Sequence, residues 1–190
     1  MKRIQQIAIL AVAASTIFTA CKKDELPTPE PVEQELITTV RLIVTNSSGF
    51  NKTFNYKVDN GFGSSTQGNV RIDDVALAPG TNYDVEVQVW DESKNPAENI
   101  TEEVIAESHH HLFIFRSNPA SGAGSIAFSN GNKDDEGEPL NQKIAFTTGA
   151  AGNGSLTVTL KHEPTNKNAA NAAEAGGETD AEAIFPVKLQ

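Results

Sequence analysis

Three consecutive histidines, His109 to His111, are the residues whose types and spacing most suggest chemistry in this chain. On a strand, His109 and His111 would point to one face and His110 to the other. Neutral imidazole binds Zn, Cu and Ni, and a tight site needs three or four ligands. The fourth histidine, His162, ends the stretch SLTVTLKH. One interpretation of the pattern is therefore a metal site formed by His109, His111 and His162, which Glu103 or Glu107 could complete.

The same histidines also have two other interpretations. They immediately precede the apolar run from Leu112 to Phe115. A junction between a helix and a buried strand would place them at a partly solvated edge without any ligand, and the sequence favours this structural role. A pH-dependent switch is the third interpretation, because imidazole titrates near pH 6.5.

A second candidate is a calcium loop in the segment NGNKDDEGEPL, residues 130 to 140. Asn132, Asp134 and Glu136 alternate and Gly137 follows, which resembles a calcium loop with glycine at its sixth position. The first position is Asn rather than Asp, however, and the twelfth is Lys143 rather than Glu. Acidic hairpin loops have the same composition, so a solvated hairpin is the favoured alternative.

The chain has one tryptophan, Trp90, which falls on the polar face of a predicted strand. An exposed tryptophan on a strand can stack on a sugar or anchor a partner protein. It can also cover the sheet beneath a following helix, and we favour this covering role. The sequence has no Gly-x-Ser-x-Gly, phosphate-binding or His-Glu-x-x-His motif, so we expect no enzymatic activity.

Alternating strands are expected to position these residues. Short runs such as Val85, Val87 and Val89 place apolar side chains at every second position, between turn signals such as LAPGTN and GAAGNGS. This period is typical of antiparallel sheets with one face in a core. Eight or nine such runs from residue 36 to 190 predict an all-β antiparallel sandwich, immunoglobulin-like or transthyretin-like.

Two segments depart from the strand pattern. Asn99 is a candidate N-cap with Glu102 three residues later, which predicts a short helix near residues 99 to 107. Residues 163 to 181 are rich in Asn, Ala and Gly without an apolar period, and predict a long mobile loop before the last strand. The alanines allow a helical turn that Gly176 and Gly177 would end.

The N-terminus carries the most specific signal. Residues 1 to 20 combine Lys2 and Arg3 with an apolar stretch too short to span a bilayer, as in a secretory signal peptide. Phe18-Thr19-Ala20-Cys21 resembles a bacterial lipobox, with Phe18 in place of the usual Leu. Cys21 is the only cysteine. This resemblance implies that Cys21 carries fatty acyl chains such as palmitate, which anchor the protein in the membrane.

The segment after Cys21 implies a location. Residues 21 to 35 are acidic and rich in proline, as in an extended tether. Lys22-Lys23-Asp24-Glu25 resembles the export signal of Bacteroidota-type surface lipoproteins, although any solvated tether is also charged. We expect the outer membrane, facing the periplasm or the cell surface, with the surface favoured. The formal net charge of -10 disfavours nucleic acid as a partner.

Four longer stretches of the sequence, which together cover most of the chain after the tether, also resemble known lipoproteins. ELITTVRLIVT, LAPGTNYDVEVQVWDESKNPAENITEEVIAES, TTGAAGNGSLTVTLKHEPTNKN and GGETDAEAIFPVKLQ resemble small lipoproteins of Bacteroidota-type bacteria. The resemblance implies a location and a fold but no ligand. We therefore expect a non-enzymatic binding or accessory module for a protein or glycan partner, with metal binding as the alternative and a hydrolase as the least favoured function.

Overall fold

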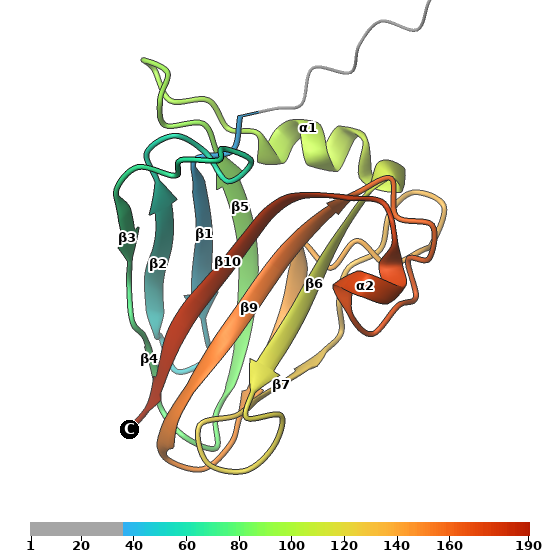
Figure 1. The fold of residues 1–190 in the computed structure, drawn as a ribbon. Helices are drawn as coiled ribbons and strands as arrows, with labels where there is room; N and C mark the ends of the chain where they lie inside the picture. Colours follow the sequence, from blue (N-terminus) through green and yellow to red (C-terminus); the bar gives the residue numbers. More distant parts are fainter. Residues whose placement is uncertain (1–35) are drawn as a thin grey trace, which may run out of the picture. The chain divides into compact units, whose positions relative to one another are not determined.

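Two β-sheets pack face to face in the computed structural model, which describes residues 36–190 (Figure 1). One sheet has six strands in the order β3-β2-β1-β5-β8-β7, and the other has four in the order β4-β10-β9-β6. All pairs are antiparallel except β10 with β4. The strands are β1 (Thr39–Thr45), β2 (Asn51–Val58), β3 (Val70–Ile72), β4 (Val75–Leu77), β5 (Asn82–Trp90), β6 (His111–Asn118), β7 (Ile126–Ser129), β8 (Lys143–Thr148), β9 (Gly152–His162) and β10 (Glu178–Leu189). The predicted all-β sandwich is confirmed.

The core consists of the apolar side chains that alternate along the strands. In β9, for example, Leu156, Val158 and Leu160 are fully buried between the sheets. The strand β6 is buried on both faces, as its unbroken apolar run predicts. Phe113 belongs to the main core, whereas Leu112 packs into a smaller cluster with Ala175. Burial of this apolar surface is the main source of stability.

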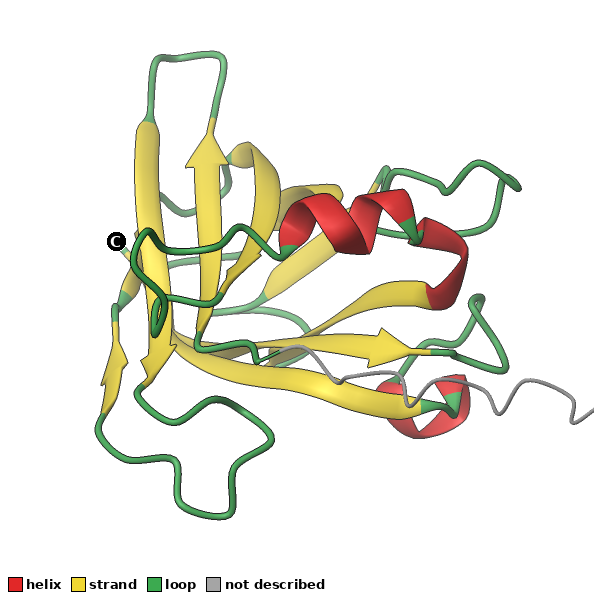
Figure 2. Ribbon diagram, turned by 90° about the horizontal axis from the view of Figure 1, so that it is seen from above, coloured by secondary structure: helices red, strands yellow, loops and turns green. Residues whose placement is uncertain are grey.

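Helices close one end and one side of the sandwich. Helix α1 (Thr101–Ala106) and the 3-10 turn η1 (Ser108–His110) run across the end of the two sheets and lead into β6 (Figure 2). Thr101 attaches α1 to the end of β5, because its hydroxyl accepts a hydrogen bond from Val89 N and donates one to Val89 O. Helix α2 (Ala172–Ala175) lies beside β6 and β9.

Three local predictions require correction. Strands β3 and β4 were not expected, because three residues are too few for an alternating pattern to be recognised. Helix α1 has Ile100 as its N-cap, one residue later than predicted. Asn99 and Glu102 are nevertheless paired at the start of the helix, because Asn99 Oδ1 accepts a hydrogen bond from Thr101 N and Asn99 Nδ2 donates one to Glu102 Oε1. The predicted loop from 163 to 181 contains α2 and the first residues of β10. Its helical turn has a specific cap, because Asn171 Oδ1 accepts a hydrogen bond from Glu174 N.

The predicted signal peptide, Cys21 and the tether lie outside the described residues. Among the residues that the structure does describe, no helix has the length and apolar character needed to cross a membrane.

Candidate metal centre

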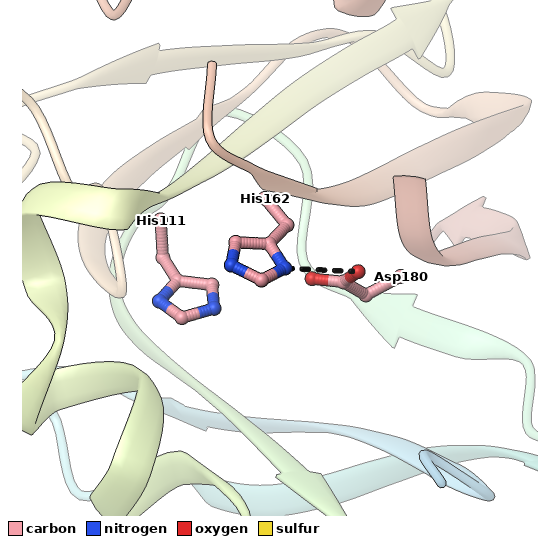
Figure 3. A group of neighbouring side chains, drawn as sticks. All are labelled: His111, His162 and Asp180. Atoms are coloured by element: carbon pink, nitrogen blue, oxygen red, sulfur yellow. Dashed lines mark ion pairs between the residues drawn. The ribbon is translucent and has the colours of Figure 1, made fainter. Parts of the chain in front are cut away.

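Two imidazoles and one carboxylate gather at the end of the four-stranded sheet, beneath α1. His111 begins β6, His162 ends β9, and Asp180 lies in β10, so the three residues come from three neighbouring strands (Figure 3). His111 and His162 are direct partners in the register of β6 and β9, and their rings stack with centroids 4.9 Å apart. One ligand atom from each of the three residues lies within 4.8 Å of the others.

A β-bulge brings Asp180 into this group. Counting back by twos from Phe185 and Ala183, which face the core, the alternation would turn Asp180 outward. The pairing of β10 with β9 shifts between Thr179 and Ala181, so Asp180 is an extra residue at this point. Bulges redirect side chains in this way. As a result, Asp180 Oδ1 lies 4.0 Å from His162 Nδ1 (Figure 3).

The buried ring of His111 is held in a form that can bind a metal. Its Nδ1 lies 3.1 Å from the carbonyl oxygen of Glu107 at the end of α1. Because a carbonyl only accepts hydrogen bonds, Nδ1 must carry the proton, and the neutral ring keeps its lone pair on Nε2. Burial lowers the pKa of His111 below its usual value of 6.5, and the nearby His162 adds to this effect against the opposing influence of the Glu107 carbonyl. The neutral ligand form is therefore favoured at pH 7.

The space around the three residues suits a small ion. A cavity of about 40 Å³ is lined by the three residues together with Ile37, Val104, Glu107 and Leu160. In a tetrahedral zinc site with bonds of 2.0–2.2 Å, the ligand atoms lie about 3.3 Å apart. The separations here are up to 4.8 Å, so the side chains must rotate inward by about 1 to 1.5 Å to share an ion. The backbone already places all three on the same cavity.

The sequence predicted His111 and His162 as members of this group, but it wrongly added His109. His109 does not share a face with His111, because Ser108–His110 forms a 3-10 turn instead of continuing the strand. The exposed His109 lies against the ring of His110, with centroids 3.9 Å apart. Asp180 was missed, and no periodic signal in the sequence marks the bulge that turns it inward.

The residues predicted to bind calcium lie in the hairpin between β7 and β8, where two of their side chains hydrogen-bond to the hairpin backbone. Asn132 Oδ1 accepts a hydrogen bond from Lys143 N, and Asp134 Oδ1 accepts from the backbone N–H groups of Glu136 and Glu138. The other oxygen of Asp134 lies 2.5 Å from Lys167 Nζ, in an ion pair that is almost fully buried. A positive charge therefore already sits where a calcium ion would need this carboxylate, and the geometry favours the hairpin alternative.

The ion pair of Lys167 also supports the turn that leads into the metal centre. Lys167 Nζ donates a hydrogen bond of 2.7 Å to the carbonyl oxygen of Ser108, at the start of η1. A single ammonium group thus joins the α2 segment, the β7–β8 hairpin and η1. This arrangement fixes the turn immediately before His111.

Trp90 lies on the outer face of the six-stranded sheet, opposite to the face that buries Val87 and Val89. The Arg41 guanidinium lies over its ring at 5.0 Å, and the indole N–H donates a hydrogen bond to Gln88 Oε1. One face of the ring is therefore occupied by a cation. This contact leaves less of Trp90 available to a partner than the sequence suggested.

The lowered pKa of His111 predicts how stability depends on pH. In the metal-free protein, the free energy of unfolding should fall as the pH drops below 6.5. The unfolded chain binds a proton at His111 near pH 6.5, whereas the folded protein does so only at a lower pH, so protonation favours unfolding between the two pKa values. About one pH unit above 6.5 both states are deprotonated at this residue, and it contributes no slope.

Urea unfolding in EDTA at a series of pH values between about 7.5 and 5 measures this slope. A His111→Gln variant should have a smaller slope below pH 6.5, and an exposed-site control, His109→Gln, should keep the slope of the original protein. Equal slopes in all three proteins would show that His111 is not the titrating group.

Comparisons with protein-family models, with curated proteins and with solved structures find no match to this chain.

Proposed function

We propose that this chain is a lipid-anchored, non-enzymatic binding module of the outer membrane whose sandwich binds a transition-metal ion such as Zn²⁺. The observation that carries the proposal is the group His111, His162 and Asp180, with ligand atoms within 4.8 Å of one another. Two imidazoles and a carboxylate are ligands that zinc accepts, and three protein ligands leave one position for water. The hydrogen bond from His111 Nδ1 to a backbone carbonyl is the kind of outer contact that orients metal-binding histidines.

The size of the cavity supports binding rather than catalysis. Its volume of about 40 Å³ is far below the roughly 300 to 1,000 Å³ of a typical small-molecule site. An ion with a bound water fits this space, whereas an organic substrate does not. The rest of the cavity wall includes the apolar side chains of Ile37, Val104 and Leu160. We therefore propose metal capture or a metal-stabilised fold, without turnover.

The location is proposed from the sequence. The lipobox-like residues before Cys21 support acylation, and the Lys22-Lys23-Asp24-Glu25 segment supports export to the cell surface. An acidic tether would then hold the sandwich away from the membrane. A protein or glycan partner at the surface is part of the same proposal.

Metal loading of the full chain, purified in detergent, tests the metal proposal. We expect elemental analysis after dialysis against Zn²⁺, Cu²⁺ or Ni²⁺ to find one ion per chain. Free metal at 100 times its Kd should stabilise the folded state by about 2.7 kcal/mol. Ca²⁺ is the matched control, because imidazole is a poor ligand for a hard cation that prefers oxygen. Absence of bound metal together with unchanged melting would refute metal binding and leave the three residues as a structural polar cluster.

A further inference from the structure

A groove on the outer face of the six-stranded sheet is separate from the metal centre. Two adjoining cavities of about 390 and 360 Å³ lie over β1, β5 and β8, and both are lined by Asp84, Asn130 and Ala145. In β5, Asp84 and Glu86 alternate with the buried Val85, which places both carboxylates on the solvent side of the sheet. Volumes of this size are typical of ligand sites.

The lining of the groove is rich in neutral hydrogen-bonding groups. Its only positively charged side chain among the described residues is Lys143, whose Nζ lies 3.8 Å from Glu86. Asp84 takes part in no ion pair with the described residues. The uncharged polar residues are Thr45, Asn46, Ser47, Asn82, Ser129, Asn130, Asn132 and Thr147. Two partly exposed apolar side chains, Ile43 and Ala145, lie among them.

Two asparagines of the groove have side-chain amides whose orientation is fixed by hydrogen bonds from the backbone, so that each offers its Nδ2 group as a donor. Asn46 Oδ1 accepts from the N–H groups of Ser48 and Phe50, and Asn132 Oδ1 accepts from that of Lys143. A backbone N–H can only donate, so these bonds determine which end of each amide is the oxygen. Within the described part of the chain, neither Nδ2 group makes a hydrogen bond. Asn46 lines one cavity and Asn132 the other.

An acceptor lies between these two donors. Asp84 is common to both cavities, and its carboxylate makes no hydrogen bond to the residues that the structure describes. A ligand that matches the groove must therefore accept hydrogen bonds near Asn46 and Asn132 and donate them near Asp84. Hydroxyl groups do both. An anion would be repelled by Asp84 and by the formal net charge of -10, and a simple cation would leave the amide donors unmatched.

We infer that this groove binds a neutral, hydroxyl-rich ligand, namely a segment of an oligosaccharide. Ile43 and Ala145 offer apolar contact to the C–H groups of a sugar ring. From Asn82 to Glu86 the groove follows four residue steps of β5, about 13 Å, which suits a short oligosaccharide. The groove lies on a sheet face, where no free backbone ladder is available, so an added peptide strand is not the ligand that it fits.

Binding of the full chain in detergent to an array of neutral oligosaccharides, including glucans, mannans, xylans and galactans, tests the inference. We expect at least one of these classes to bind. Asn46→Asp and Asn132→Asp keep the Oδ1 acceptor that holds the local backbone but replace the Nδ2 donor, so each should weaken binding about tenfold or more. Asn171→Asp is the matched control, since it makes the same change at the cap of α2, outside the groove, and should leave binding unchanged.

Three results would overturn the inference. The first is that none of the oligosaccharides binds. The second is that binding is equal in the Asn46, Asn132 and Asn171 variants. The third is that a parallel array of extended peptides binds in a manner that Asn46→Asp and Asn132→Asp abolish. Repeating the measurement in EDTA separates this site from the metal centre, because removal of metal should not change oligosaccharide binding.

Discussion

Replacing His162 with alanine is expected to weaken Zn²⁺ binding by the full chain by about 100-fold or more. The variant retains His111 and Asp180, which are fewer protein ligands than the three found even in open zinc sites. Loss of an outer contact alone costs 10- to 100-fold in known sites, so loss of a direct ligand should cost at least as much. Competition with a chelator of known affinity measures the change.

Two variants make this result specific. His109→Ala removes a histidine that lies outside the group, and it should bind Zn²⁺ as the original protein does. Asp180→Asn keeps the shape of the third ligand but removes its charge, so a smaller loss of affinity is expected. Urea unfolding in EDTA should show that each variant still folds. If His162→Ala and His109→Ala bind Zn²⁺ equally well, His162 is not a ligand.

Replacing Cys21 with serine is expected to move the protein from the membrane fraction to the soluble fraction almost completely. A serine cannot carry the thioether-linked lipid of a bacterial lipoprotein, and the remaining acidic tether has no other affinity for an anionic membrane. Each buried CH₂ of an acyl chain contributes about 0.8 kcal/mol, so several chains hold a protein far more strongly than one. Fractionation of cells and partition into detergent measure the change.

The neighbouring residues provide the control for this experiment. Thr19→Ala keeps a small residue before Cys21 and should leave the protein in the membrane fraction. Cys21→Ser protein that still partitions with membranes would refute the lipid anchor, whatever the result for metal binding. The two proposals are therefore tested independently.

The fold could be predicted from the sequence because its strands alternate strongly. Runs such as Leu156, Val158 and Leu160 place one apolar residue at every second position, and only a sheet with one buried face uses that period. The short strands β3 and β4 could not be predicted, because three residues carry no usable period. The place of β3 is set by pairing with β2, the strand before it, and that of β4 by pairing with β10, which is far away in the sequence.

The candidate site was predicted only in part, for the same physical reason. His111 and His162 are adjacent to strand patterns, so each could be placed at a strand end from its own neighbours. His109 was placed wrongly because the turn from Ser108 to His110 forms where α1 meets β6, and no local period announces it.

Local features of this protein are therefore encoded in short stretches of sequence, whereas its candidate site depends on contacts between distant ones. The strand faces follow from residues a few positions apart, and so do the predictions of a lipobox at Cys21 and of an acidic tether. The meeting of His111, His162 and Asp180 required the register of three strands and a bulge that adds one residue to β10. A shift of a single residue exchanges the two faces of a strand. Only the assembled sheet decides on which face Asp180 lies.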